Sequence, residues 1–137
     1  MRTKRTEAYH IIINDHVNLF NGKYVSNNKE NFNFGTSHRM SMADAIKFAV
    51  HHLTQPNTCL LGHNIKADID FLRKSSSHKI SVPVFDTQAI YKYHTLSQQP
   101  AALSKVLDDL KITYSNLHNA GNDAAYTLLA FKKLAKL

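Results

Sequence analysis

The sequence predicts a single α/β domain with a mixed sheet. The first quarter of the chain has a β pattern, because residues 9–14 form a β-branched run and Asn21-Gly22 stands between two short apolar segments, a strong hairpin signal. After residue 40, short apolar runs alternate with segments of helical periodicity. With 137 residues and 43% hydrophobic content, the chain suits one core, so we assign residues 1–137 to one domain.

Start and stop signals separate the elements that follow. Ser41 is the expected N-cap of a helix that ends at Gln55-Pro56-Asn57. Residues 27–35 are rich in asparagine and predict a loop that Phe32 and Phe34 anchor. We expect further strands at residues 59–62 and 82–85, and further helices at residues 65–74, 100–110 and 119–137. Asp86-Thr87 is the expected cap of another helix, which runs to about His94.

The composition of the chain favours one class of binding partner and one kind of cell compartment. The formal net charge of +7 favours a polyanionic partner such as nucleic acid, although a basic soluble protein with no such partner is an equal alternative. Cys59 is the only cysteine and lies in an apolar run, which predicts a buried thiol and a reducing compartment. No apolar stretch has the length of a membrane span and no signal peptide is evident, so we expect an intracellular protein of the cytoplasm, the nucleus or both, with no membrane partner.

Two segments combine a histidine with an aspartate at an expected helix start. Gly62-His63-Asn64 ends a strand, and Asp68 follows one helical turn later. His118 precedes the last helix, and Asp123 lies in the first turn of that helix. In open α/β sheets, ligands bind at the carboxyl ends of strands, so both aspartates are candidates for a common site.

The spacing alone is a weak signal. The same separation of histidine and aspartate occurs at His10 and Asp15. Asp123 could serve only the helix dipole, and Asn64 could be only a helix cap. The order of the segments adds weight, because a strand that ends in Phe85-Asp86-Thr87 lies between them.

The motifs resemble those of a known nuclease group. Gly62-His63-Asn64-x3-Asp68-x2-Phe71-Leu72 is similar to the second motif of DnaQ-like 3′→5′ exonucleases of the ribonuclease H-like superfamily. His118-x4-Asp123-Ala124 resembles their third motif in its histidine-containing, DEDDh version. The segments around residues 10, 21, 32 and 117 look more narrowly like the C-terminal domain of the fungal Gfd family, which is linked to mRNA export.

This resemblance implies a fold, a chemistry and partners. The fold would be a ribonuclease H-like mixed sheet flanked by helices. Asp68 and Asp123 would bind Mg²⁺ or Mn²⁺, and His118 would be the catalytic base. The partners would be RNA or single-stranded DNA, together with mRNA-export proteins. The candidates for nucleic-acid contact are His63, Asn64 and Asn119.

The chain departs from the family pattern in its first motif. The family takes two of four carboxylates from an Asp-x-Glu pair on the first, central strand. The only glutamates are Glu7 and Glu30, and Arg5 and Asn28 stand two residues before them. We therefore expect an N-terminally incomplete domain without that strand, catalytically incomplete because two-metal hydrolysis needs a bridging carboxylate. With that strand supplied, the domain would be an active exonuclease. Without the strand, the domain would be a nucleic-acid-binding or protein-interaction module.

Overall fold

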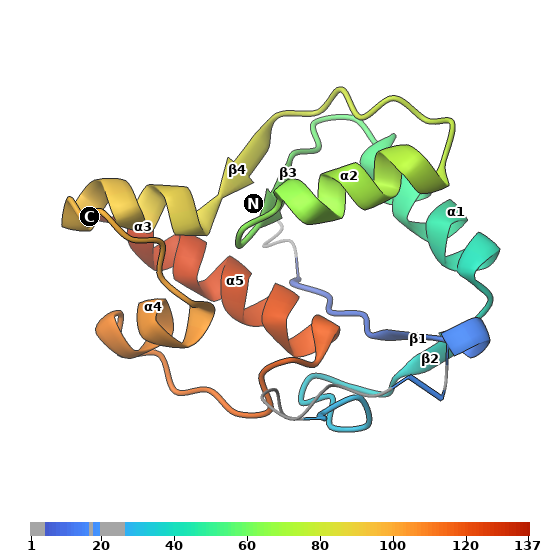
Figure 1. Ribbon diagram of the computed structural model, residues 1–137, viewed down its shortest axis with the longest axis horizontal. Helices are drawn as coiled ribbons and strands as arrows, with labels where there is room; N and C mark the ends of the chain where they lie inside the picture. Colours follow the sequence, from blue (N-terminus) through green and yellow to red (C-terminus); the bar gives the residue numbers. More distant parts are fainter. Residues whose placement is uncertain (1–4, 17, 20–26) are drawn as a thin grey trace.

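The computed structural model describes residues 5–16, 18–19 and 27–137 (Figure 1). The strands are β1 (Ile11–Ile13), β2 (His38–Met40), β3 (Leu60–Gly62) and β4 (Val84–Asp86). The helices are α1 (Met42–Leu53), α2 (Lys66–Ser75), α3 (Thr87–Thr95), α4 (Leu103–Asp109) and α5 (Ala120–Leu134), with a short 3-10 helix at Asn14–His16. The predicted α/β class is confirmed.

The strands form two separate parallel pairs. β1 pairs with β2, with Ile12 opposite Arg39, and β3 pairs with β4, with Leu61 opposite Phe85. The described residues therefore do not join into one mixed sheet. The predicted hairpin around Asn21-Gly22 lies outside the described residues.

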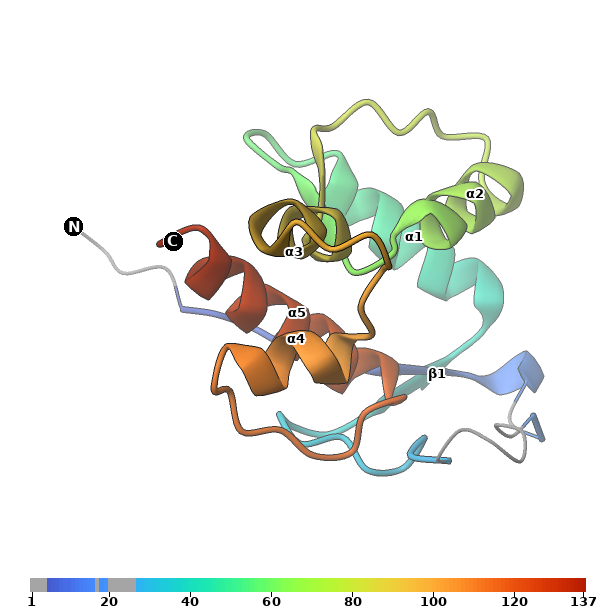
Figure 2. The same ribbon diagram turned by 60° about the vertical axis from the view of Figure 1, so that its left-hand side comes forward.

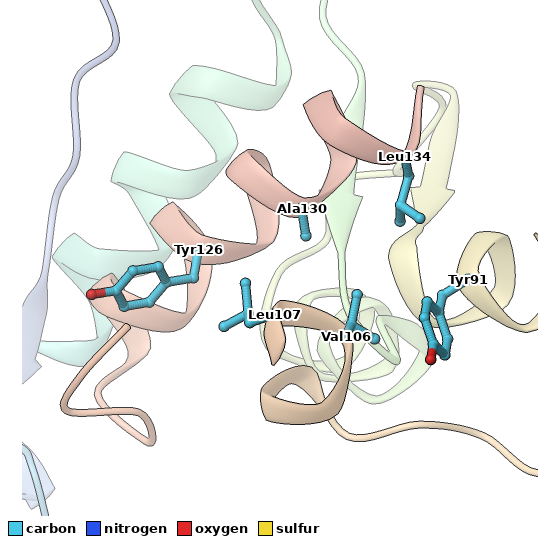
Figure 3. Close-up of a cluster of buried hydrophobic side chains, with 6 residues drawn as sticks. All are labelled: Tyr91, Val106, Leu107, Tyr126, Ala130 and Leu134. Atoms are coloured by element: carbon cyan, nitrogen blue, oxygen red, sulfur yellow. The ribbon is translucent and has the colours of Figure 1, made fainter. Parts of the chain in front are cut away.

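The C-terminal helix is the centre of the molecule. α5 crosses the middle, with α3 and α4 packed along it, whereas α1 and α2 lie on the other side of β3 (Figures 1 and 2). Apolar side chains of α3, α4 and α5 form the main core (Figure 3). Its buried members are Tyr91, Val106, Leu107, Tyr126, Ala130 and Leu134.

Local hydrogen bonds explain where the helices begin. The Ser41 hydroxyl accepts a hydrogen bond from the Asp44 backbone N–H at 3.1 Å, which confirms Ser41 as the N-cap of α1. Asp86 accepts from the Gln88 backbone N–H at 2.9 Å and caps α3. α4 begins at Leu103, after the position expected from Pro100, because the chain before it is extended at Ala102.

The predicted burial of Cys59 is wrong, because its thiol is exposed. Cys59 directly precedes β3, whose residues are only half-buried, and β3 pairs with β4 alone among the described residues. An apolar run at the start of a strand that pairs with only one other strand therefore need not be buried at every residue. In the described part of the chain, no helix is both long and apolar enough to cross a bilayer.

Candidate functional site

A cleft of about 370 Å³ contains the candidate carboxylates from both motifs. Its walls come from the end of β3, from α2, and from the N-terminal parts of α4 and α5. The lining residues are His63, Asp68, Leu103, Ala120, Asp123, Ala124 and Thr127. Two segments that are far apart in the sequence thus contribute aspartates to one cleft.

The turn between β3 and α2 positions Asp68. Asn64 adopts a left-handed backbone with φ of 58°, a conformation that asparagine accepts more readily than most residues. The Asp86 carboxylate accepts hydrogen bonds from the backbone N–H groups of Asn64 at 2.9 Å and Ile65 at 3.2 Å. A Cβ on Gly62 would lie 2.6 Å from the Ile65 side chain, so Gly62 permits this close turn. Asp68 then falls in the first turn of α2.

His63 connects three segments at the same cleft. Its Nε2 lies 2.8 Å from the carbonyl oxygen of Ala101, which can only accept, so Nε2 donates. Its Nδ1 lies 2.9 Å from the hydroxyl oxygen of the buried Thr87, and that hydroxyl donates to the Gly62 carbonyl at 3.1 Å. These bonds fix the imidazole at the cleft wall. Its contact with nucleic acid stays a prediction.

Asp123 and His118 form a local unit at the start of α5. Asp123 Oδ1 accepts a hydrogen bond from the His118 backbone N–H at 3.1 Å. His118 has a φ of 67°, and its side chain is exposed and is not among the residues that line the cleft. The structure therefore brings together Asp68, Asp123 and His63, whereas His118 is exposed and contacts Asp123 through its backbone N–H.

The environment of both aspartates favours their neutral form. Burial raises the pKa of the Asp68 carboxyl, and burial also raises the pKa of the Asp123 carboxyl. For the Asp123 pKa, the hydrogen bond from the His118 backbone N–H and the electrostatic interactions with His118 and His63 act in the opposite direction. Two carboxylates that are costly to ionise at one cleft are typical of functional sites.

The described residues do not complete a divalent-metal site. Asp68 and Asp123 offer the oxygen ligands that Mg²⁺ and Mn²⁺ prefer. Within those residues, however, no three or more side chains of histidine, cysteine, aspartate or glutamate are grouped so that they could bind one ion. A two-metal centre also needs a carboxylate that bridges the ions. The two aspartates can therefore be part of such a centre but do not constitute it.

The two asparagine candidates have different environments. Asn64 is exposed at the turn before α2, and the N-cap residue of that helix is Ile65, so Asn64 is not its cap. Asn119 is 1% exposed, and its amide caps α5 and donates to the Asn28 carbonyl at 3.0 Å. Contact between Asn119 and nucleic acid would require these bonds to break, and both contacts stay predictions.

The role of Asp86 in the β3–α2 turn and the roles of Thr87 and Asn122 were not predicted from the sequence. Asp86 was expected as a helix cap, but its bonds to the preceding turn depend on the pairing of β3 with β4. Thr87 lies next to that cap and bonds to His63. Asn122 stands between Asn119 and Asp123, and this repeated polar pattern at a helix start was the one available signal.

Together these features define an α/β domain with a pair of acidic residues at helix starts around one cleft. The chain belongs to the family of DEDDh C-terminal domains, described as DNA polymerase III subunit epsilon-like, C-terminal domain, which matches residues 1–134. The resemblance to DnaQ-like exonucleases seen in the motifs is thereby confirmed.

Three fungal proteins are similar over 93% of this chain. The uncharacterized nucleolar protein C2C4.08 of Schizosaccharomyces pombe is 30% identical, and this chain spans 56% of its length. "Good for full DBP5 activity protein 2" and the uncharacterized protein YDR514C, both of Saccharomyces cerevisiae, are each 27% identical. This chain spans 28% and 32% of those two proteins, so it corresponds to part of each relative.

Proposed function

We propose that this chain is the nucleic-acid-binding part of a DEDDh-type 3′→5′ exonuclease domain and is catalytically incomplete by itself. The observation that carries the proposal is the cleft that combines Asp68 and Asp123. Family membership supports a nucleic-acid substrate. In the proposed chemistry, these two carboxylates are metal ligands and His118 is the base beside them.

Charge supports nucleic acid as the partner class. Seventeen lysine and arginine residues outnumber ten acidic ones, which gives a formal charge of +7. Phosphate contacts made by such cations depend steeply on salt and carry little sequence information. The cleft itself repels phosphate while its carboxylates are ionised and no cation is bound. We therefore expect the basic surface to supply binding, with little sequence preference.

A ligand count supports catalytic incompleteness. The hydrolysis expected for this family needs a carboxylate that bridges two ions, and the sequence contains no Asp-x-Glu pair to supply it. His118 alone cannot replace that ligand, because the pKa of a water molecule that is not bound to a metal stays far above neutral pH. A strand with Asp-x-Glu, added ahead of Tyr9, would supply the two further carboxylates.

The test uses labelled single-stranded RNA and DNA with Mg²⁺ or Mn²⁺. We expect the chain to retain both polymers at low salt, to release them at high salt, and to shorten neither. The extended chain, which carries an added Asp-x-Glu strand ahead of Tyr9, should shorten them from the 3′ end. His118→Ala or Asp123→Asn in the extended chain should abolish that shortening. Metal-dependent shortening by the chain alone, lost in His118→Ala, would contradict incompleteness.

A protein-interaction module in mRNA export is the second candidate. The observation that favours it is the name of one relative, which connects that relative with the activity of DBP5. The same binding experiment separates the candidates. A chain that retains neither RNA nor DNA at low salt, but binds the DBP5 protein of its own organism, would favour the second candidate over nucleic-acid binding.

A further inference from the structure

An asparagine network joins the segment 27–33 to the loop that precedes α5. We define the network by its side chains, which bond across 82 to 91 residues of sequence. Its members are Asn28, Asn33, Asn116, Asn119 and Asn122. The loop that they contact, residues 115–119, contains His118.

Asn33 and Asn28 bond to the loop on the N-terminal side of His118. The Asn33 amide donates to the Ser115 carbonyl at 3.0 Å, and its oxygen accepts from the Asn116 amide at 2.8 Å. The Asn28 amide donates to the Leu117 carbonyl at 2.7 Å. Three consecutive residues before His118 are thus bonded to the segment 27–33.

Asn122 and Asn119 complete the network from within α5. Asn122 is fully buried, and its side-chain oxygen accepts a hydrogen bond from the Asn33 backbone N–H at 2.8 Å. Its side-chain amide donates to the Asn116 carbonyl at 3.0 Å and to the Asn31 carbonyl at 2.8 Å. Asn119 accepts from the Asn122 backbone N–H at 3.1 Å. Buried amides that use all these bonds define one conformation of the loop, because each lost partner would leave a polar group unsatisfied.

His118 differs from its neighbours in this loop. Its backbone N–H bonds to Asp123, and its side chain stays exposed. His118 has a φ of 67° and Asn116 has a φ of 53°, a left-handed conformation that is unfavourable for residues with a Cβ. A short loop with two such residues needs contacts from outside to keep its shape, and the network provides them.

We propose that Asn33 and Asn28 are positioning residues that fix the loop 115–119, so that His118 is presented beside Asp123. The chemistry of His118 rests on the proposed function, but the geometry of the loop does not. Packing next to the segment gives it an independent anchor, since Phe34, the residue that follows it, contacts Tyr126 edge-on with ring centroids 5.4 Å apart. The Asn33 side chain is therefore expected to govern the local conformation of the loop and not the fold.

The experiment compares amide hydrogen exchange in Asn33→Ala and Asn31→Ala. Asn31 is a matched control, because it lies in the same segment and its side-chain amide donates only to Asn28 among the described residues. We expect the His118 amide to exchange on the order of tenfold faster in Asn33→Ala, since several loop hydrogen bonds are lost. The Ala130 amide inside α5 should be unchanged, and Asn31→Ala should resemble the parent chain.

Two results would overturn the proposal. One is an unchanged His118 amide in Asn33→Ala, and the other is an equal acceleration at His118 and Ala130, which would indicate a general loss of stability. Failure of the proposed function has a different signature, namely no retention of single strands by the parent chain. In the extended chain, Asn33→Ala should lower the hydrolysis rate, with nucleic-acid binding by its basic surface unchanged.

Discussion

We expect burial of the cleft aspartates to lower the stability of the fold at neutral pH, mainly at the half-buried Asp123, because Asp68 is more exposed. Burial raises the pKa of Asp68 and of Asp123, so the folded protein binds their protons more tightly than the unfolded chain does. Their ionisation therefore costs folding free energy once the pH exceeds the unfolded pKa of about 3.9. Residues that reduce stability in this way are characteristic of sites where chemistry, and not packing, selects the side chain.

Replacing both aspartates by asparagine should stabilise the protein. The amide of Asn at position 123 keeps an oxygen that can accept from the His118 backbone. We expect Asp68→Asn with Asp123→Asn to raise the unfolding free energy at pH 7 by on the order of 1 kcal/mol or less, mostly through the half-buried Asp123.

The gain should shrink as the pH falls through the raised folded pKa values and should vanish near the unfolded value, about 3.9. Urea unfolding of parent and variant at pH 7 and at about pH 3.5 measures it. A variant less stable than the parent at pH 7 would show that the ionised carboxylates stabilise the fold.

The positions of some residues could be predicted from the sequence, whereas the environments of others could not. Asp68 and Asp123 could be assigned to one cleft, because each stands at a helix start and matches a motif. The burial of Asn119 could not be predicted, because its partners are in a segment about 90 residues away. Cys59 was misjudged for a related reason, since exposure depends on which strands are neighbours.

Among the elements, Asp86 connects the two strand-to-helix units. It ends β4, caps α3, and accepts the backbone N–H groups of Asn64 and Ile65 before α2. The same carboxylate therefore sets the start of two helices, one of which carries Asp68. Disturbing it should affect the cleft as well as the stability.

We expect Asp86→Ala to lower the unfolding free energy by about 2 kcal/mol. A lost N-cap accounts for about 1 kcal/mol, and the two unsatisfied N–H groups of the turn account for the remainder. Asp44→Ala is the control, since Asp44 also stands at a helix start, in the first turn of α1, but the hydroxyl of Ser41 caps that helix. Urea unfolding measures both variants. Equal effects within about 0.5 kcal/mol would refute the double role of Asp86.

Helices were easier to predict than strands for a physical reason. Helical periodicity and caps are local, so the signals at Ser41 and Asp86 gave correct helix starts. Strands of three residues carry little periodicity, and their pairing depends on distant segments. The α/β class was therefore accessible from the sequence, whereas the separation into two parallel pairs was not.

At the scale of the whole molecule, an apolar helix face and several strand edges stay open among the described residues. On α5, Ala125, Leu128 and Leu129 line a cavity of about 390 Å³ together with residues 6–9. Each strand pair also has unpaired edges among the described residues. Open strand edges beside an apolar helix face are what an added strand would cover.

The extended chain, with its Asp-x-Glu strand ahead of Tyr9, should therefore be more stable than the chain alone. Covering the open strand edges and the apolar helix face would increase the area that becomes exposed on unfolding. Both the urea midpoint and the slope of free energy against urea should rise, because the slope scales with that area.

The control is an added strand of equal length with proline at every third position, which removes backbone N–H donors on both of its edges and so prevents regular pairing in the sheet. If the Asp-x-Glu strand and the proline strand gave the same urea midpoint and slope, the Asp-x-Glu strand would not pair with the open strand edges. The two aspartates would then have to obtain their missing partners in another way. If only the Asp-x-Glu strand raised the urea midpoint and the slope, the open strand edges and the missing carboxylates would have the same cause, namely the absence of that strand.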